Sequence, residues 1–482
     1  MLRTSGRLLG AALVAGTCLA ATCLAGAGAA QARADATVTA SLGASRAVPP
    51  GYFGINYDYG GAAVYAKDRS VAQQIAALAP GTLRWPAGTG ANYFQWQKGY
   101  PVADSAADWA ADPAAGTKGS CAPPAESQTD GFQFTLGDLA AAVRAARGTA
   151  TPVFDLNVMT ASLASQIDML RTAQDRYGLP VRYVELGNEF YLCNADYVAA
   201  FPTAQDYGTT VAADVKALHR AFPGVRVAAV GAVPSVSSGR TQGWTSGLLS
   251  VATGAGKPDA ITLHDHPEFN QTLTAAGLPA LFAIPYSSAE NVATATRQFP
   301  GTPAWITEYG LSLHFGGANA PQLTYANALF ESEAAILLAQ QVSAATLINY
   351  WSAFGPSLNY AYTASGLTPA GLAMQWLDQA ARGATREAPV VFSGGPVLGA
   401  TGDPALVGES FRSGFAGGQS TMLINLSGST VTIGAAAFGG GYRQVSGDPT
   451  REIGTASGLS TTSGYADRTI TLAPYSMTVI GG

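Results

Sequence analysis

Two glutamates follow apolar stretches that have the character of buried β-strands. Residues 182–186 run into Gly187-Asn188-Glu189, and residues 304–307 run into Glu308. Either glutamate alone would be an ordinary solvated carboxylate at the start of a loop. Together, at matching ends of two strands, they provide the pair of carboxylates that cleaves a glycosidic bond with retention of configuration. The pattern predicts Glu189 as the general acid/base and Glu308 as the nucleophile.

The elements that must position these glutamates are strands alternating with helices. The expected strands are 53–57, 82–86, 152–158, 182–186, 225–231, 260–264, 305–308 and 345–351. The expected helices are 70–78, 135–147, 165–177, 205–222, 323–341 and 368–382. This α/β alternation predicts a (β/α)8 TIM barrel, in which catalytic groups lie at the carboxyl ends of the strands. The fourth and seventh strands end across a mouth about two strand-widths in radius, so the two carboxylates can converge.

A β-rich region follows the barrel. Short apolar segments separated by Gly, Ser and Asp predict an antiparallel β-sandwich over 387–482, and the barrel then spans 51–386. An isolated strand-like segment within 35–50 precedes the barrel, and we expect it to join the sandwich. The sandwich sequence shows no row of exposed aromatic residues, so a structural role is expected for it.

The first 34 residues resemble a secretory signal peptide. They contain two arginines near the start, an apolar run over 8–24 and an Ala-x-Ala motif over 32–34. We expect cleavage near Asp35 and an extracellular protein without a stable membrane anchor. A transmembrane anchor is the alternative.

Net charge and cysteine content bear on the ligands and the cellular compartment of the protein. The formal net charge is −5, so the chain lacks the basic footprint of a nucleic-acid-binding protein. Cys121 and Cys193 remain after removal of the signal, and a disulfide between them is predicted for an oxidising compartment. Two free buried thiols are the alternative. The bridge would hold the long aromatic segment 88–134 beside Glu189.

A His-x-His motif ends the sixth strand. Strand alternation places His264 and His266 on one face, and we expect one histidine to line the sugar site near Glu308. A metal site is one alternative, because two histidines and a carboxylate form a ligand pattern, and a structural, hydrogen-bonded histidine is the other. Trp351, at the end of the eighth strand, is predicted to stack on a sugar ring, although a core position is also possible for it.

These motifs resemble glycoside hydrolase clan A, whose retaining barrel enzymes carry Asn-Glu after the fourth strand and the nucleophile after the seventh. The resemblance implies that Asn188 hydrogen-bonds the sugar 2-hydroxyl. It also implies that Arg84, which ends the second strand, keeps the nucleophile ionised. A surface or interdomain salt bridge is the alternative role of Arg84.

Within the clan, the β-domain completed by an N-terminal strand is similar to family 79, the β-glucuronidases and heparanase, with families 39, 51 and 30 nearby. The segments that carry this similarity are 186–189, 350–351, 368–370 and 472–479. Residues 84–88, with Asn92, Tyr93 and Trp96, are also similar to the arabinofuranosidases of family 51. The first substrate prediction is a β-glucuronide or related β-glycoside, and an α-L-arabinofuranoside or a β-xyloside is the alternative.

Recognition of a uronic acid requires donors for its carboxylate. Between Glu308 and Glu387 the basic residues are Arg382 and Arg386, both near the final helix, so neutral donors such as Tyr309 would be needed. No cofactor is expected, because acid/base chemistry between two carboxylates requires none. From a different class, the chain could be a catalytically silent carbohydrate-binding protein on a barrel scaffold.

Overall fold

The computed structural model describes residues 38–49, 51–65, 71–102, 132–146, 150–234, 239–269, 272–312, 321–355, 360–414, 418–453 and 458–481. The predicted signal peptide and Cys121 therefore lie outside the described residues.

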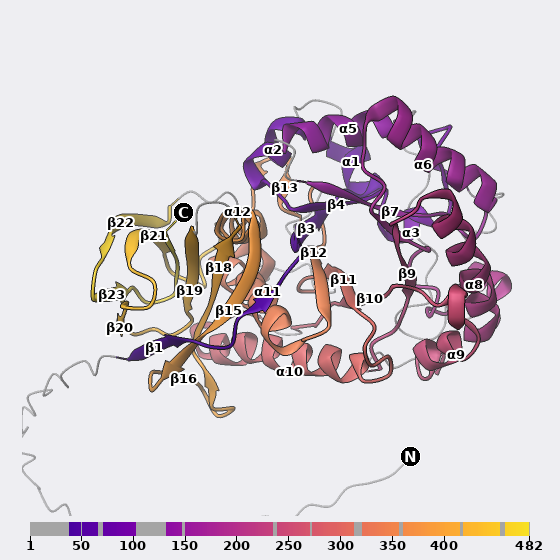
Figure 1. The fold of residues 1–482 in the computed structure, drawn as a ribbon. Helices are drawn as coiled ribbons and strands as arrows, with labels where there is room; N and C mark the ends of the chain where they lie inside the picture. Colours follow the sequence, from indigo (N-terminus) through magenta and orange to yellow (C-terminus); the bar gives the residue numbers. More distant parts are fainter. Residues whose placement is uncertain are drawn as a thin grey trace, which may run out of the picture. The chain divides into compact units, whose positions relative to one another are not determined.

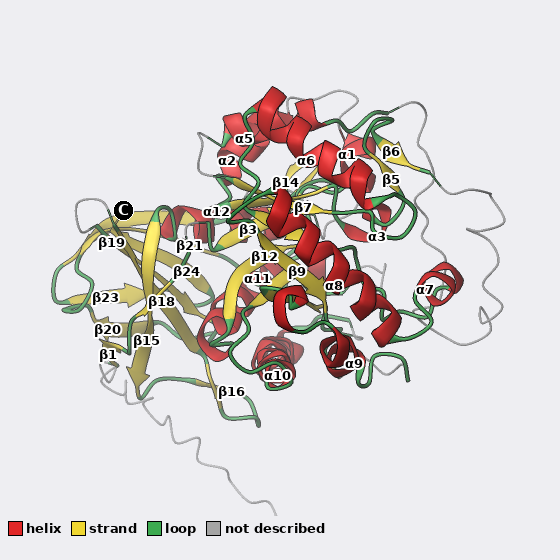
Figure 2. Ribbon diagram, turned by 45° about the vertical axis from the view of Figure 1, so that its right-hand side comes forward, coloured by secondary structure: helices red, strands yellow, loops and turns green. Residues whose placement is uncertain are grey.

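Eight parallel strands close into a barrel, with helices around its outside (Figures 1 and 2). The strands are β3 (Phe53–Asn56), β4 (Thr82–Trp85), β7 (Thr151–Asp155), β8 (Tyr183–Glu185), β9 (Arg226–Val230), β10 (Ala260–Asp265), β11 (Ala304–Tyr309) and β12 (Ala345–Tyr350). Each falls on a predicted strand, so the barrel prediction is confirmed. The strands are apolar because both faces are covered, one by the barrel interior and the other by helices.

The helices of the barrel layer also follow the predicted order. They are α1 (Tyr59–Tyr65), α2 (Val71–Leu78), α3 (Gly88–Ala91), α5 (Leu136–Ala145), α6 (Leu163–Tyr177), α7 (Ala195–Ala200), α8 (Ala204–Ala221), α9 (Trp244–Val251), α10 (Leu278–Thr296), α11 (Tyr325–Gln341) and α12 (Pro369–Ala380). The six predicted helices correspond to α2, α5, α6, α8, α11 and α12, whereas α1, α3, α7, α9 and α10 were not predicted. Helix α10 contains Pro285, and a proline normally ends a helix. Among the described residues, no helix is long and apolar enough to cross a membrane.

The second region is built on an antiparallel sheet of order β1-β15-β18-β19-β24-β21-β22, with β2 also paired to β15. Its strands are β1 (Thr39–Leu42), β2 (Arg46–Ala47), β15 (Ala384–Ser393), β18 (Leu406–Ser413), β19 (Gln419–Asn425), β21 (Gly440–Ser446), β22 (Ser460–Ala466) and β24 (Ser476–Gly481). The predicted N-terminal strand does join this β-domain. Strands β21 and β22 were not predicted, because they are rich in Gly, Ser and Thr and lack an apolar alternation.

Short two-stranded sheets complete the fold. In the β-domain, β20 (Val431–Gly434) pairs with β23 (Thr469–Leu472) and β16 (Val397–Leu398) with β17 (Asp403–Pro404). Strands β20 and β23 enclose a second apolar core against the large sheet. Near the barrel mouth, β5 (Phe94–Gln95) pairs with β6 (Tyr100–Pro101), and β13 (Tyr362–Thr363) pairs with β14 (Gly366–Leu367). The β5–β6 hairpin lies in the long aromatic segment after the second barrel strand.

Arg46 ties the N-terminal strand β2 to both regions. Its guanidinium donates to Glu387 Oε1 in β15 at 2.6 Å and to the carbonyl oxygens of Ala339 and Ala345 at 2.8 and 3.2 Å. The Glu387 side chain is only 2% exposed, whereas that of Arg46 is 30% exposed. Burial raises the pKa of Glu387 to about 6, although the positive charge of Arg46 opposes that shift.

We predict that Arg46→Ala lowers the free energy of unfolding by about 3 kcal/mol, because it leaves the buried carboxylate of Glu387 without its partner. Urea unfolding at pH 8, where Glu387 is ionised, measures the loss. The double variant Arg46→Ala/Glu387→Gln should regain part of the stability, because it removes the unpaired charge. Equal stability of the single and double variants would contradict this account.

Candidate active site

The two predicted glutamates meet at the carboxyl-terminal mouth of the barrel. Nδ1 of His264 lies 2.9 Å from Glu189 Oε1 and 3.5 Å from Glu308 Oε2. One nitrogen therefore bridges both carboxylates, and their bridged oxygens cannot be farther apart than the sum of these distances. The two carboxylates therefore lie close together at the barrel mouth, as a pair that acts on one glycosidic bond would.

The tip that carries Glu189 has an unusual backbone. Gly187 has φ +85°, and a Cβ on it would lie 2.3 Å from the ring of Phe190, so only glycine fits. Glu189 itself has φ +49°, in the left-handed region that non-glycine residues rarely occupy. Such a conformation costs on the order of 1 kcal/mol or more, and the surrounding contacts must offset that cost.

Arg84, at the end of β4, lies beneath the site with its side chain fully buried. Its Nε donates to Glu185 at 2.6 Å, its Nη1 to Glu308 at 2.7 Å, and its Nη2 lies 2.8 Å from Asp155. Asn56 Oδ1 accepts from Nη1 at 3.0 Å. Burial alone would lower the pKa of Arg84, but the three carboxylates outweigh burial and raise it above its ordinary value. Arg84 is therefore a permanent buried cation.

This arrangement sets the charge on the nucleophile. Burial would raise the pKa of Glu308, but His264, His266 and Arg84 reverse that effect and lower it to about 2. Asp155 behaves in the opposite way: burial raises its pKa well above the ordinary value, because Arg84 compensates its charge only in part. Glu308 consequently keeps its negative charge at neutral pH.

Asn188 offers an unused donor. Its Oδ1 accepts from Arg84 Nη2 at 2.8 Å, which fixes the amide and directs its NH2 group elsewhere. That Nδ2 is buried and has no hydrogen-bond partner. The backbone of Asn188 is held on both sides by Asn92, whose Oδ1 accepts from its N–H at 2.9 Å and whose Nδ2 donates to its carbonyl at 2.7 Å. This unpaired NH2 group at the barrel mouth can donate a hydrogen bond to a hydroxyl group of a ligand.

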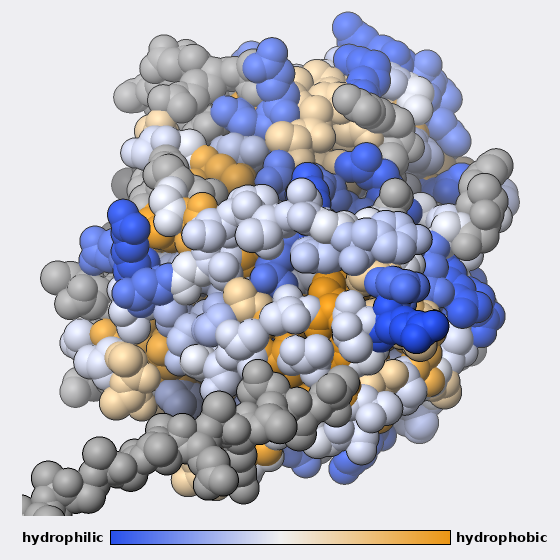
Figure 3. All heavy atoms as spheres, turned by 90° about the vertical axis from the view of Figure 1, so that its left-hand side faces the viewer, coloured by the Kyte–Doolittle hydropathy of each residue, from blue (hydrophilic) through white to orange (hydrophobic). Residues whose placement is uncertain are grey.

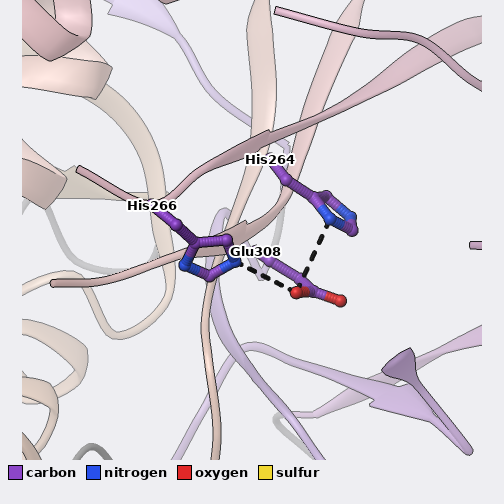
Figure 4. A group of neighbouring side chains, drawn as sticks. All are labelled: His264, His266 and Glu308. Carbon is purple, nitrogen blue, oxygen red and sulfur yellow. Dashed lines mark hydrogen bonds and ion pairs between the residues drawn. The ribbon is translucent and has the colours of Figure 1, made fainter. Parts of the chain in front are cut away.

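His266 pairs with the nucleophile (Figure 4). Its Nε2 lies 3.1 Å from Glu308 Oε2, and its Nδ1 lies 3.3 Å from the carbonyl oxygen of Gly310. Both neighbours accept hydrogen bonds, so both ring nitrogens carry protons and the ring is cationic. Burial would lower the pKa of His266, but the hydrogen bond and charge of Glu308 raise it to about 9.

His264 is oriented by a second hydrogen-bonded chain. The hydroxyl of Thr307 donates to Glu185 Oε1 at 3.1 Å and can therefore accept from His264 Nε2, also at 3.1 Å. The other nitrogen, Nδ1, then faces Glu189. If Glu189 is ionised, Nδ1 donates to it, and if Glu189 is protonated, Nδ1 accepts from it. His264 and Glu189 thus share one proton.

Glu189 receives a second donor on the same oxygen. The hydroxyl of Tyr191 donates to Glu189 Oε1 at 2.9 Å, and His264 contacts that oxygen too. Within the described part of the chain, no side chain donates to Oε2, which is left for a ligand. Burial raises the pKa of Glu189, but the hydrogen bond and charge of His264 outweigh it, so the pKa lies below its ordinary value.

The metal alternative involves the same atoms. His264, His266 and Glu308 present ligand atoms that all lie within 4.8 Å of one another. Figure 4 shows both rings directed at the Glu308 carboxylate, and dashed lines mark contacts of 3.1 and 3.5 Å. Imidazolium–carboxylate pairing accounts for these contacts, so we assign an ion-paired nucleophile here.

One predicted substrate contact does not reach the site. Tyr309 follows Glu308 directly, so strand alternation directs it to the opposite face. Its hydroxyl contacts Met374 Sδ in α12 at 3.4 Å, its ring packs on Tyr350, and it is 1% exposed. The assignment of Tyr309 as a donor to substrate is therefore wrong, because the side chain belongs to the layer between strands and helices.

Two further predictions can be placed only in part. Trp351 follows β12 and is half-buried, and a Cβ on Gly88 would lie 2.6 Å from its ring, so the indole adjoins the loop after β4. A stacking role for Trp351 stays a prediction. Cys193 is disulfide-bonded, and because Cys121 lies outside the described residues, its pairing with Cys193 also stays a prediction.

Several residues that build the site were not predicted to do so. Glu189 was predicted from its position at the carboxyl end of a barrel strand. The same rule could have identified four polar residues that lie in barrel strands, namely Asn56, Asp155, Glu185 and Thr307. A polar residue in an otherwise apolar barrel strand is the signal. Asn92 and Tyr191 lie in loops after strands, where residue spacing gives no such signal.

No protein-family model and no curated protein matches the chain. Among solved structures it is similar to a family 51 α-L-arabinofuranosidase from Bifidobacterium longum, with TM-score 0.69, 16% identity and coverage of 92% of this chain and 99% of the other. It is also similar to the α-L-arabinofuranosidase of Thermotoga maritima in complex with arabinose (TM-score 0.67, 15% identity, 92% and 100% covered). A 4-O-α-L-rhamnosyl-β-D-glucuronidase from Fusarium oxysporum gives a TM-score of 0.62 at 15% identity, with 92% and 100% covered. At these identities the likeness establishes the fold, a barrel followed by a β-domain.

The raised pKa of His266 predicts a pH-dependent stability. A histidine whose pKa rises from its ordinary value of 6.5 to about 9 stabilises the fold fully below pH 6.5, and its contribution is lost as the pH passes 9. Urea unfolding of the wild type and of His266→Gln should therefore differ most at pH 6, by about 1 kcal/mol once screening of this partly exposed ring by solvent is allowed for, and converge near pH 10. A difference that is constant with pH would contradict the ion pair with Glu308.

Proposed function

We propose that the chain is a retaining glycoside hydrolase of the clan A type. The observation that carries the proposal is the pair of carboxylates that a single nitrogen of His264 bridges, one ionised by its neighbours and the other sharing a proton. The resemblance of the motifs to clan A, and the fold shared with three solved glycosidases, support the same reaction class.

In the first step, the ionised Glu308 attacks the anomeric carbon. A glycosyl ester forms on its carboxylate as the bond from that carbon to the leaving oxygen breaks. The leaving oxygen takes a proton from the carboxyl group of Glu189, which becomes a carboxylate. The aglycone departs as an alcohol, and the pair is left without its proton. Charge moves from Glu308 to the Glu189–His264 pair.

In the second step, Glu189 acts as a base. It accepts a proton from water while the water oxygen attacks the anomeric carbon, and the ester bond to Glu308 breaks. The proton is restored to the Glu189–His264 pair, and Glu308 regains its negative charge. Arg84 and His266 stabilise that charge, which makes the carboxylate a good leaving group at this stage.

Asn188 supports the transition state of both steps. The unpaired Nδ2 is a donor that a sugar hydroxyl next to the anomeric centre can satisfy. Hydrogen bonds to the 2-hydroxyl that strengthen in the transition state lower the barrier in retaining glycosidases by several kcal/mol. Because Arg84 and Asn92 already fix this amide, little entropy is lost when it binds substrate.

For the substrate we favour an α-L-arabinofuranoside. Two observations favour it over the β-glucuronide suggested by family 79. Residues 84–88 and Asn92 are similar to family 51, and two of the similar solved structures are arabinofuranosidases. A β-glucuronide is the second candidate, because the imidazolium of His266 places a cation at the mouth and the Fusarium oxysporum enzyme is named for a glucuronide.

We also propose that the protein is secreted. The signal-like segment 1–34 supports this, and so does the disulfide at Cys193, because disulfides persist in oxidising compartments. The alternative of a silent carbohydrate-binding protein is less well supported, since a binder has no need of a nucleophile held ionised by Arg84 and His266.

A screen of aryl glycosides tests the nucleophile and the sugar together. Aryl α-L-arabinofuranoside, β-glucuronide, β-xyloside and β-glucoside are incubated with the wild type and with Glu308→Gln. We predict release of aglycone from the arabinofuranoside and loss of about 10⁴-fold or more of kcat in the variant, which lacks the attacking carboxylate. Near-normal turnover by Glu308→Gln would overturn the mechanism.

The role of Glu189 is tested through the leaving group. Glu189→Gln removes the shared proton, so we predict a loss of about 10²- to 10⁴-fold in kcat on an alkyl glycoside, whose alkoxide leaves poorly. The loss should be much smaller on a dinitrophenyl glycoside, which needs no protonation. The ratio of the two losses is the measurement, and equal losses on both substrates would contradict the acid/base assignment.

A further inference from the structure

A row of four residues crosses the large sheet of the β-domain. Tyr465 in β22 pairs with Gly441 in β21, and Ser420 in β19 pairs with Gly481 in β24. Tyr442 pairs with Ile480, so the preceding Gly441 lies next to Gly481. Cross-strand partners point to one face, and the four residues therefore form a line about 14 Å long across four strands.

Gly441 leaves an open space on this line, which we call the groove. A Cβ built on Gly441 would meet no atom within 4 Å, so the surface above it is open. A cavity of about 420 Å³ lies here, and Gln379 of α12 and Arg443 of β21 are among its lining residues. The guanidinium of Arg443 lies 5.0 Å from the ring centroid of Trp376, which fixes the arginine at the groove wall.

One end of the groove holds an unsatisfied polar group. Ser420 is 8% exposed, and its Oγ has no hydrogen-bond partner in the structure. A buried hydroxyl without a partner loses its water hydrogen bonds without replacement, which is unfavourable unless a ligand supplies the bond. Ser420 lines the cavity, so the missing partner can come from a ligand in the groove.

An exposed aromatic ring lies on the edge strand next to Gly441 and Gly464, which line the cavity. Tyr465 is 76% exposed, and it is the most exposed large hydrophobic residue in the described part of the chain. It lies at the edge strand of the sheet on the same face as Gly441. Much of the β-domain surface that faces the reader in Figure 3 is hydrophilic or weakly polar, with only scattered hydrophobic patches. This favours a polar ligand over an apolar protein partner.

We propose that this groove binds a carbohydrate chain. Sugar rings stack their apolar faces on tyrosine, and their hydroxyls pair with guanidinium, amide and hydroxyl groups such as those of Arg443, Gln379 and Ser420. The groove is a non-catalytic site that holds a polysaccharide while the barrel mouth acts on its branches. The choice of carbohydrate rests on the proposed function. The β-domain thereby gains a binding role where its sequence indicated a purely structural one.

Filling the groove tests the proposal. In full-length Glu308→Gln protein, which should not cut the polymer, retardation is measured in native gels that contain soluble arabinoxylan. Gly441→Trp places an indole in the open space and should abolish retardation. Tyr465→Ala, at an exposed site, should weaken binding about tenfold. Gly434→Trp is the matched control, because a Cβ at this other β-domain glycine also meets no atom within 4 Å, and it should bind normally.

The outcomes separate the groove from the active site. Retardation that survives Gly441→Trp, or that is absent from the starting protein, overturns the proposal. In chains that retain Glu308, Gly441→Trp should leave hydrolysis of the aryl α-L-arabinofuranoside unchanged. If none of these chains hydrolyses it while the gel retardation still depends on Gly441, the substrate assignment fails and the groove stands.

Discussion

The guanidinium of Arg84 is the charge around which the barrel mouth is arranged. Three strands each direct a carboxylate at it, Asp155, Glu185 and Glu308, and all three contacts are between 2.6 and 2.8 Å. Breaking a buried ion pair by removing one partner costs about 3–5 kcal/mol, so the cation and its carboxylates depend on one another for the fold as well as for chemistry. The same cation orients Asn188 through a hydrogen bond to its side-chain oxygen.

The two histidines divide the remaining charge. His266 faces only acceptors and stays cationic beside the nucleophile, whereas Nδ1 of His264 faces Glu189 Oε1. Two carboxylates this close would otherwise repel each other and compete for one proton. The histidines therefore let Glu308 remain an anion while Glu189 has access to a proton, and this division is what a double displacement needs at its first step.

The sequence predicted the barrel and the residues that end its strands, because buried parallel strands are apolar and a polar residue at their end is conspicuous. The prediction for Tyr309 was wrong because side chains alternate along a strand. Glu308 faces the barrel mouth, so the next residue, Tyr309, faces the helices. It could not find Asn92 or Tyr191, whose contacts depend on how loops fold over the mouth. Strand β22 and the groove beside it could not be predicted either, because segments rich in Ser, Thr and Gly lack the alternation of apolar and polar residues that indicates a strand.

The central claim is that Glu308 forms a covalent bond to the sugar, and the configuration of the first product tests it most directly. Proton NMR of the anomeric region, recorded in the first minutes of hydrolysis of an aryl glycoside, distinguishes the two anomers before they interconvert. The account predicts a first product with the same anomeric configuration as the substrate. A first product of inverted configuration would show direct attack by water and would contradict it.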